Sequence, residues 1–156
     1  CYRRELDNRY TFAELAEMAA GAAVYDWALD VNADCFMAPE RVSEAIRAEC
    51  ARAGVPAPKT PAETAHCIFS SLAHEYARAA DGLDELLDCK TDTIYIVGGG
   101  SKNAYLNALT QTFSGRRDRA PGGDRGRQSR QTIHSHRASY RRELFDHDKK
   151  FPIKER

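Results

Sequence analysis

The sequence predicts an α/β fold that is rich in helix, and three observations lead to this prediction. Helix-start signals of the Ser/Thr-x-x-Glu type stand at Thr11 and Thr60, each followed by apolar residues at helical spacing. One short β-branched and aromatic stretch, residues 93–97, predicts a strand. This stretch runs into three glycines and then into another helical pattern. Helices and strand therefore alternate as in an α/β unit.

The first two helices are predicted from their ends. Thr11 opens a helix whose apolar face ends near residues 21–24. After an irregular connector over residues 25–38, Pro39 suits the first helical position, because its missing amide proton would be unpaired there anyway. We therefore expect a second helix over residues 39–53, which Gly54 can end in the left-handed conformation.

The longest helix is predicted to run from Thr60 to about residue 87. Thr60 is a capping residue, a proline follows it in the first turn, and Glu63 completes the capping box. After this helix we expect a largely buried strand at residues 93–97, since the stretch is almost wholly apolar. A last helix should begin at Ser101 or Lys102 and end before the glycine at position 115.

Length and composition are those of one globular domain. The chain has 156 residues, of which 42% are hydrophobic and 29% charged. It contains no apolar run of the roughly eighteen residues that a membrane helix needs, and its first residues lack the apolar core of a signal peptide. We therefore expect a cytoplasmic protein with no membrane partner, and an excerpt of a longer chain.

The five cysteines do not follow a metal-binding pattern. Their number is odd, no Cys-x-x-Cys pair occurs, and no histidine stands at zinc-finger distance. Buried reduced thiols are the expected state in a cytoplasmic protein. Cys50 and Cys67 lie near facing ends of consecutive predicted helices, so a disulfide between them stays open as the less favoured alternative.

The three glycines favour an anion site. A strand that ends in Gly98, Gly99 and Gly100 and turns into a helix brings backbone amides and the positive helix end together, with no Cβ to hold a ligand away. A tight turn that needs glycine only for its φ angles is the plainer alternative. The Walker loop is excluded because Lys102 precedes Asn103 rather than Ser or Thr, and the dinucleotide fingerprint would need glycine at residue 103.

Several motifs, spaced in order along the chain, fit one known family. Residues 32–39 read Asn-x-Asp-x-Phe-x-x-Pro, residues 67–73 read Cys-Ile-Phe-x-Ser-Leu-Ala, and residues 96–103 read Ile-Val-Gly-Gly-Gly-Ser-Lys-Asn, followed by Leu-Asn-Ala-Leu at 106–109. Together they resemble the C-terminal part of the FGGY carbohydrate kinases, in the version of the branch that phosphorylates L-rhamnulose. The resemblance covers about residues 10–117.

This resemblance implies a fold, a reaction and a site. The fold is part of the second domain of an actin-like (ribonuclease H-like) ATPase, in which two α/β domains enclose a cleft. The turn formed by Gly98, Gly99 and Gly100 would lie against ATP, with Gly99 as the first candidate and Asn103 as a side-chain donor near the nucleotide. The reaction would be transfer of the ATP γ-phosphoryl to the 1-hydroxyl of L-rhamnulose in rhamnose catabolism, with Mg²⁺ bridging the phosphates.

The catalytic half of such a kinase is not recognisable here. The family's catalytic aspartate lies upstream of the matched segment, so we assign no catalytic residue, and acids such as Asp7 and Asp26 are expected to lie on helix surfaces and loops. Because residues 93–97 form the one convincing strand, its sheet partners are expected outside the chain. We expect the chain alone to be loosely packed and inactive as a kinase.

The last part of the chain follows a different composition. Residues 1–117 carry twelve Lys/Arg and seventeen Asp/Glu, whereas residues 118–156 carry eleven and six and contain few large apolar side chains. Too little apolar surface is available there to offset the entropy of ordering the backbone. We therefore divide the chain into a partial nucleotide-binding domain, residues 1–117, and an Arg/Gly-rich tail that is disordered or results from a reading-frame change.

Other functions stay open at this point. Another FGGY kinase, for fuculose, xylulose or glycerol, would share the nucleotide-side motif, although the two upstream motifs favour L-rhamnulose. The basic tail could bind nucleic acid, but no recognisable module accompanies its charge, so a solvated tail without function is favoured.

Histidines could bind a metal, and aromatic side chains could bind a sugar, so both are considered as site residues. His134 and His136 are too few for a metal site. We expect His66 and His74 on the surface of the long helix, and Tyr25 and Trp27 as packing anchors rather than a sugar platform.

Overall fold

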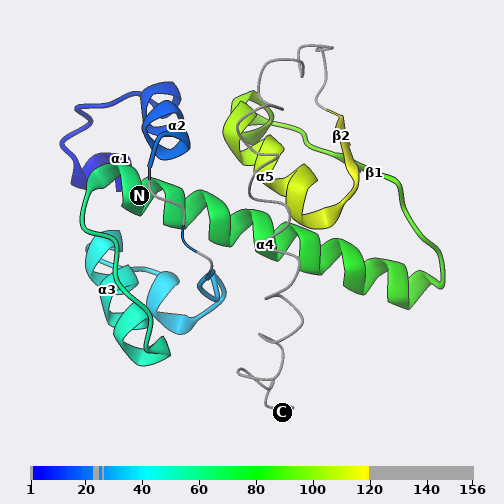
Figure 1. The fold of residues 1–156 in the computed structure, drawn as a ribbon, viewed down its shortest axis with the longest axis horizontal. Helices are drawn as coiled ribbons and strands as arrows, with labels where there is room; N and C mark the ends of the chain where they lie inside the picture. The colour runs from blue at the N-terminus through cyan, green and yellow to red at the C-terminus, as the bar shows by residue number, and fades with distance from the viewer. Residues whose placement is uncertain (1, 23–24, 26, 120–156) are drawn as a thin grey trace.

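The computed structural model describes residues 2–22, 25 and 27–119, and it confirms a helix-rich fold arranged along one long helix. The elements in chain order are α1 (Tyr2–Glu5), α2 (Phe12–Ala20), the 3₁₀ helix η1 (Asp34–Phe36), α3 (Val42–Ala53), α4 (Pro61–Leu87), β1 (Thr93–Tyr95), the 3₁₀ helix η2 (Gly99–Lys102), α5 (Ala104–Ser114) and β2 (Arg117–Arg119). Helices α1, α2 and α3 gather around the first half of α4, and α5 lies along its middle (Figure 1).

The capping box at Thr60 sets the start of α4 as predicted. The Thr60 hydroxyl accepts from the Glu63 amide at 3.2 Å, and the Glu63 carboxylate accepts in return from the Thr60 amide at 3.3 Å. The same carboxylate accepts from the Tyr25 hydroxyl at 2.9 Å, so it also ties down the connector that follows α2. The helix ends at Asp88, which adopts a left-handed φ of 47°.

The other capping box also forms, but α3 begins later than predicted. Thr11 caps α2 reciprocally with Glu14, as expected. Helix α3 starts at Val42, three residues after Pro39, and its first turn is capped from a distance: the Ser43 amide and hydroxyl both donate to the Glu5 carboxylate of α1. A cap that comes from another helix leaves no local sequence signal, which explains the error. Helix α1 itself was not predicted, because four residues are too short to show periodicity.

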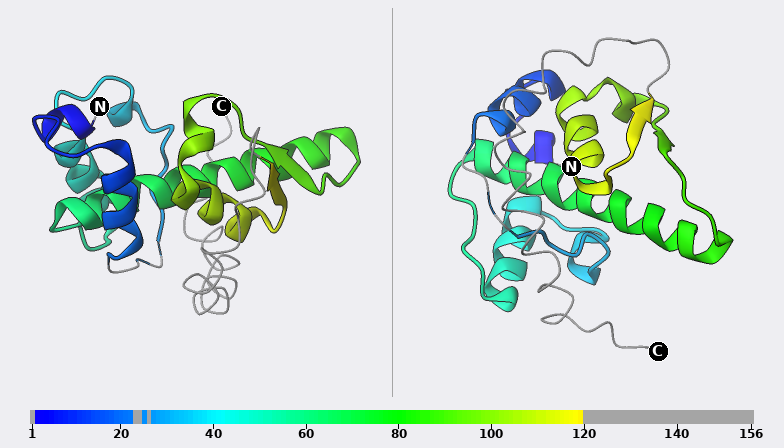
Figure 2. Two further views of the ribbon diagram at one scale, coloured as in Figure 1. Left: turned by 90° about the horizontal axis from the view of Figure 1, so that it is seen from above. Right: turned by 45° about the vertical axis from the view of Figure 1, so that its right-hand side comes forward.

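The predicted strand is shorter and more exposed than expected. It covers Thr93–Tyr95 rather than residues 93–97, with Tyr95 68% and Val97 72% exposed. Its expected lack of a partner is also wrong, since β1 pairs in parallel with β2, Thr93 opposite Arg117 (Figure 2). Strand β2 is missed because its residues, Arg117–Arg119, are charged and lack β propensity. A sheet of two short strands leaves a face uncovered, which explains the exposure.

Three apolar clusters fill the space around α4. The first joins the connector after α2 to α3 and α4, the second joins α1 and α2 to α4, and the third joins α5 to α4. Their most buried members are Trp27, Leu29, Ile46, Cys50 and Cys67; Tyr2, Leu15, Ala19 and Ala65; and Ala73, Leu106 and Leu109. The residues from α4 in these clusters are small, so neighbouring helices approach it closely.

Trp27, the cysteines and His66 differ in how deeply the fold buries them. Trp27 packs in the first cluster, as expected of an anchor. Cys50 and Cys67 are buried and reduced, but Cys35 and Cys89 are exposed, which corrects the expectation of buried thiols. His66 is only 2% exposed, so its predicted surface position is wrong. It faces α5 rather than water, and apolar spacing within α4 could not reveal that partner.

Much of the predicted tail lies outside the described residues. These end at residue 119, so the nature of residues 120–156, including His134 and His136, stays a prediction. In the part of the chain that the structure does describe, no helix has both the length and the apolar character needed to span a membrane.

Candidate nucleotide site

The glycine run forms a bend between β1 and α5. Gly98 follows the strand with φ 79° and ψ −157°, a conformation that residues with a Cβ rarely adopt. Residues Gly99–Lys102 then make one 3₁₀ turn, and α5 starts at Ala104. The predicted helix start at Ser101 or Lys102 is therefore wrong by two to three residues, because the 3₁₀ turn intervenes. We call residues 98–103 the glycine turn.

The glycine turn is open to solvent. All three glycines are exposed, and a Cβ built on Gly98, Gly99 or Gly100 would meet no atom within 4 Å. Packing therefore does not require the glycines at positions 99 and 100. Only Gly98, with its positive φ, is required by the backbone itself. The plainer alternative, a turn that needs glycine for its geometry, thus accounts for one of the three positions.

Hydrogen bonds within the turn leave two amides available. The Gly98 carbonyl accepts from the Ser101 hydroxyl at 2.7 Å and from the Ser101 amide at 3.3 Å, and the Gly100 carbonyl accepts from the Asn103 amide at 2.9 Å. Among the described residues, the Gly99 and Gly100 amides have no hydrogen-bond acceptor. Two exposed N–H groups at the start of a helical turn can bind an anion.

Asn103 has one side-chain oxygen in use and a donor group to spare. Its Oδ1 accepts from the Leu106 amide at 3.0 Å and so caps the N-terminus of α5. The Nδ2 group is held at the edge of the turn by this contact, because a capping bond fixes the plane of the amide. This orientation is compatible with the prediction that the Asn103 side chain donates a hydrogen bond to a nearby ligand.

Asn107 supports the turn from beneath, a role that sequence reasoning did not assign. It is 6% exposed, and its Nδ2 donates to the Ser101 carbonyl at 3.0 Å, which ties the 3₁₀ turn to α5. The side-chain oxygen of Asn107 has no partner among the described residues. The sequence could have indicated Asn107 by its spacing: it stands four residues after Asn103, one helical turn along the same face of α5.

The charge around the turn favours an anion. Residues 93–115 contain no Asp or Glu, and Lys102, which is exposed, is their one formal charge. All seventeen carboxylates of residues 1–117 lie in the first 92 residues. A phosphate at the glycine turn would therefore meet a cation and the start of α5 without an acid in the same segment.

His66, Cys67 and Tyr25 carry polar groups that pack in or against the helical core. The His66 Nδ1 atom lies 2.7 Å from the Tyr105 hydroxyl and so joins α4 to α5. Burial raises the pKa of the Cys67 thiol to about 12, which keeps it protonated and unreactive. Burial, followed by the hydrogen bond to Glu63, raises the pKa of Tyr25 to about 12. Within the described ranges no three His, Cys, Asp or Glu residues are placed to hold a metal ion.

The match to a known protein family begins close to the N-terminus and ends one residue after α5. Residues 2–115 match the C-terminal domain of the FGGY family of carbohydrate kinases. The chain therefore belongs to the FGGY family, and the segment matched is that family's C-terminal domain.

Several proteins to which this chain is similar are rhamnulokinases. The chain is 37% identical to the rhamnulokinase of Oceanobacillus iheyensis over 114 residues, 73% of this chain and 24% of that protein. It is 46% identical to the rhamnulokinase of Klebsiella pneumoniae over 81 residues, 52% of this chain and 17% of that protein. The chain thus spans about a quarter or less of these relatives.

One alignment extends past the end of the family match. The rhamnulokinase of Mannheimia succiniciproducens is 34% identical over 147 residues, which is 90% of this chain and 30% of that protein. An alignment of this length includes part of the segment after residue 117, although the origin of that segment stays a prediction.

Proposed function

We propose that this chain supplies the ATP side of a kinase that converts L-rhamnulose to L-rhamnulose 1-phosphate in rhamnose catabolism in the cytoplasm. Membership of the FGGY family supports the reaction class, and the rhamnulokinases among its relatives support the sugar. The domain would belong to the second half of an actin-like ATPase fold, with the sugar site outside the chain.

The observation that carries the proposal is the open glycine turn. The segment is free of carboxylates and contains three positions without a Cβ, one lysine, and two amides that have no acceptor among the described residues. These are the features of a site where the backbone approaches a phosphate closely. Gly99 is the residue we assign first, with Gly98 and Gly100 beside it and Asn103 as the side-chain donor.

The chain's own part in the reaction would be to bind and orient the nucleotide. Bound ATP supplies the γ-phosphoryl group, and positioning with charge neutralisation carries most of such a transfer. Among the described residues, no three His, Cys, Asp or Glu are placed to hold Mg²⁺, which the ATP phosphates would hold. We assign no catalytic base here, and a coupled assay should show no sugar-dependent turnover by the 156-residue chain alone.

Gly99→Ala in the full-length kinase tests the site. Gly99 does not lie in the left-handed region and a Cβ there meets nothing, so stability should change by less than about 0.5 kcal/mol. The methyl group would nevertheless occupy the approach to the amides, and we expect the Kd for ATP, measured by calorimetry, to rise on the order of ten-fold.

Gly82→Ala is the matched control for this test. Gly82 lies in α4, and a Cβ there also meets nothing within 4 Å. This variant should bind ATP as the unmodified protein does. Unchanged ATP affinity in Gly99→Ala would contradict the proposed site.

The sugar is tested separately from the nucleotide. The nucleotide-side motif is common to kinases of fuculose, xylulose and glycerol, whereas the named relatives favour L-rhamnulose. A thermal-shift panel of these sugars on the full-length kinase should show the largest stabilisation with L-rhamnulose. A larger shift with another sugar would reassign the substrate and leave the ATP site untouched.

A further inference from the structure

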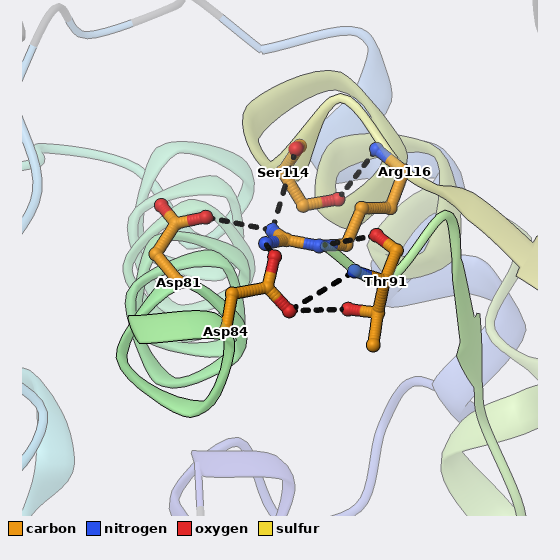
Figure 3. A network of polar contacts seen from close by, with 5 residues as sticks. All are labelled: Asp81, Asp84, Thr91, Ser114 and Arg116. Atoms are coloured by element: carbon orange, nitrogen blue, oxygen red, sulfur yellow. Dashed lines mark hydrogen bonds and ion pairs between the residues drawn. The ribbon is translucent and has the colours of Figure 1, made fainter. Parts of the chain in front are cut away.

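Arg116 lies in a network of polar contacts with α4, the loop before β1 and the end of α5 (Figure 3). It is 8% exposed, and its guanidinium contacts Asp81 at 2.8 Å and Asp84, both on α4. Its Nε donates to the Thr91 carbonyl at 3.1 Å, and its Nη1 to the Ser114 carbonyl at 3.5 Å. One buried side chain therefore touches the end of α4, the loop before β1 and the end of α5.

Asp84 strengthens this network from the opposite side. Its Oδ1 accepts from the Thr91 amide at 3.1 Å and from the Thr91 hydroxyl at 2.7 Å, while its Oδ2 accepts from Arg116. Three hydrogen bonds therefore converge on one carboxylate. We call Asp81, Asp84, Thr91 and Arg116 the arginine clamp.

The arginine clamp fixes the base of the unit that carries the glycine turn. Thr91 lies two residues before β1, and Arg116 immediately precedes β2. The Arg117 amide donates to the Asp92 carbonyl at 2.9 Å, so the parallel register of the strands starts at the clamp. From there, β1 runs to the glycine turn and α5 returns from it. The clamp and the turn are thus the two ends of one β-α-β unit.

The contacts require an arginine. Three different nitrogens of the guanidinium reach acceptors on α4, the loop and α5, and a planar fork can do this in one fixed orientation. A lysine would keep the positive charge but could not span the same acceptors at once. An Arg116→Lys substitution therefore separates the effect of the positive charge from the effect of the hydrogen-bond geometry.

We propose that Arg116 is a positioning residue for nucleotide binding, acting through β1 on the glycine turn. This inference rests on the proposed ATP site. In the full-length kinase, Arg116→Lys should raise the Kd for ATP about ten-fold while leaving the Kd for the sugar unchanged, because small displacements of a binding group cost affinity steeply. Amide hydrogen exchange over residues 93–103 should quicken in the absence of any ligand.

Arg78→Lys is the matched control for this substitution. Arg78 is also an arginine forked onto a carboxylate of α4, with Nε and Nη2 at 2.9 and 2.7 Å from Glu75, but its side chain is 63% exposed. It should change neither Kd nor the exchange. Thr91→Val keeps Arg116 and removes one hydrogen bond of the clamp, so it should act in the same direction as Arg116→Lys with a smaller effect. It replaces Arg116→Lys in the test if Arg116→Lys does not fold.

The outcomes separate the two claims. If the unmodified kinase binds ATP but Arg116→Lys and Thr91→Val bind it equally well, Arg116 has no positioning role and the proposed site stands. A parallel loss of sugar and ATP affinity in both variants would show a general structural role and overturn the inference. If the unmodified kinase does not bind ATP, the proposed function is wrong and the inference about Arg116 is wrong with it, whatever the rate of amide hydrogen exchange at residues 93–103.

Discussion

The two halves of α4 are similar in sequence pattern but differ in what covers them. The first half contributes small side chains, among them Ala65, which packs with residues of α1 and α2, and Ala73, which packs with residues of α5. The last turns carry larger apolar residues that nothing described covers: Leu83, Leu86 and Leu87 are 57, 79 and 62% exposed. Both halves keep helical spacing, so spacing identifies the helix but not its covered face.

The difference also concerns the kind of force that holds each half. Close apolar packing stabilises the first half, where Ala65, Cys67 and Ala73 of α4 are 2, 3 and 0% exposed. In the second half, ion pairs from Asp81 and Asp84 to Arg116 hold the helix to the loop and strands. Substitutions should therefore act through volume in the first half and through charge in the second.

Ala73→Leu should have the largest effect on stability. Ala73 is fully buried between α4 and α5, and a larger side chain there must displace Leu106 or Leu109. Overpacking of this kind costs about 1–3 kcal/mol in the free energy of unfolding, measurable by denaturant titration. The matched control is Ala79→Leu, at an exposed position on the same helix, which should change stability little. Equal effects at both positions would show that the two halves of α4 are covered alike.

Thr60→Ala should have an intermediate effect at the N-terminus of α4. It removes the hydroxyl that accepts from the Glu63 amide, and loss of such a cap costs about 1 kcal/mol. The melting temperature reports it, and Thr60→Ser, which keeps the hydroxyl, should restore most of the loss. If the serine variant melts as low as the alanine variant, the cap is not the cause.

Asp84, in the second half of α4, should make the stability of the protein depend on pH, with a smaller effect than the two substitutions above. Hydrogen bonds from Thr91 and Arg116 hold the pKa of Asp84 below its ordinary value. A lowered folded-state pKa contributes stability that is present above the unfolded-state pKa and is lost as pH falls through the folded-state value.

Asp84→Asn tests this dependence on pH. The stability difference between the unmodified protein and Asp84→Asn should therefore shrink from about pH 6 to about pH 3. Asp92→Asn, at an exposed aspartate before β1, is the control. A difference that stays constant over this range would contradict the account of the clamp.

Sequence patterns predicted what is local and missed what joins distant residues. Both capping boxes, the long helix and the glycine turn follow from neighbours within four positions, and these predictions are confirmed in outline. The cap of α3 by Glu5, the burial of His66 beside Tyr105 and the pairing of Asp84 with Arg116 join residues 32 to 39 positions apart. No propensity encodes such contacts, because they depend on how the whole chain folds.

The candidate site shows the same division. The glycines and Asn103 could be proposed from their order, but the supporting bond from Asn107 to Ser101 and the arginine clamp could not. Strand β2 was missed because its charged residues pair with β1 through the backbone. The arginine clamp, and not the β propensity of the side chains, sets where this pairing begins.

A crystal structure of the full-length kinase with a non-hydrolysable ATP analogue tests the central claim most directly. We predict nucleotide atoms within about 3.2 Å of the Gly99 or Gly100 amide nitrogen, with the Asn103 side chain beside them. A nucleotide bound elsewhere, with the glycine turn contacting only solvent, would contradict the account.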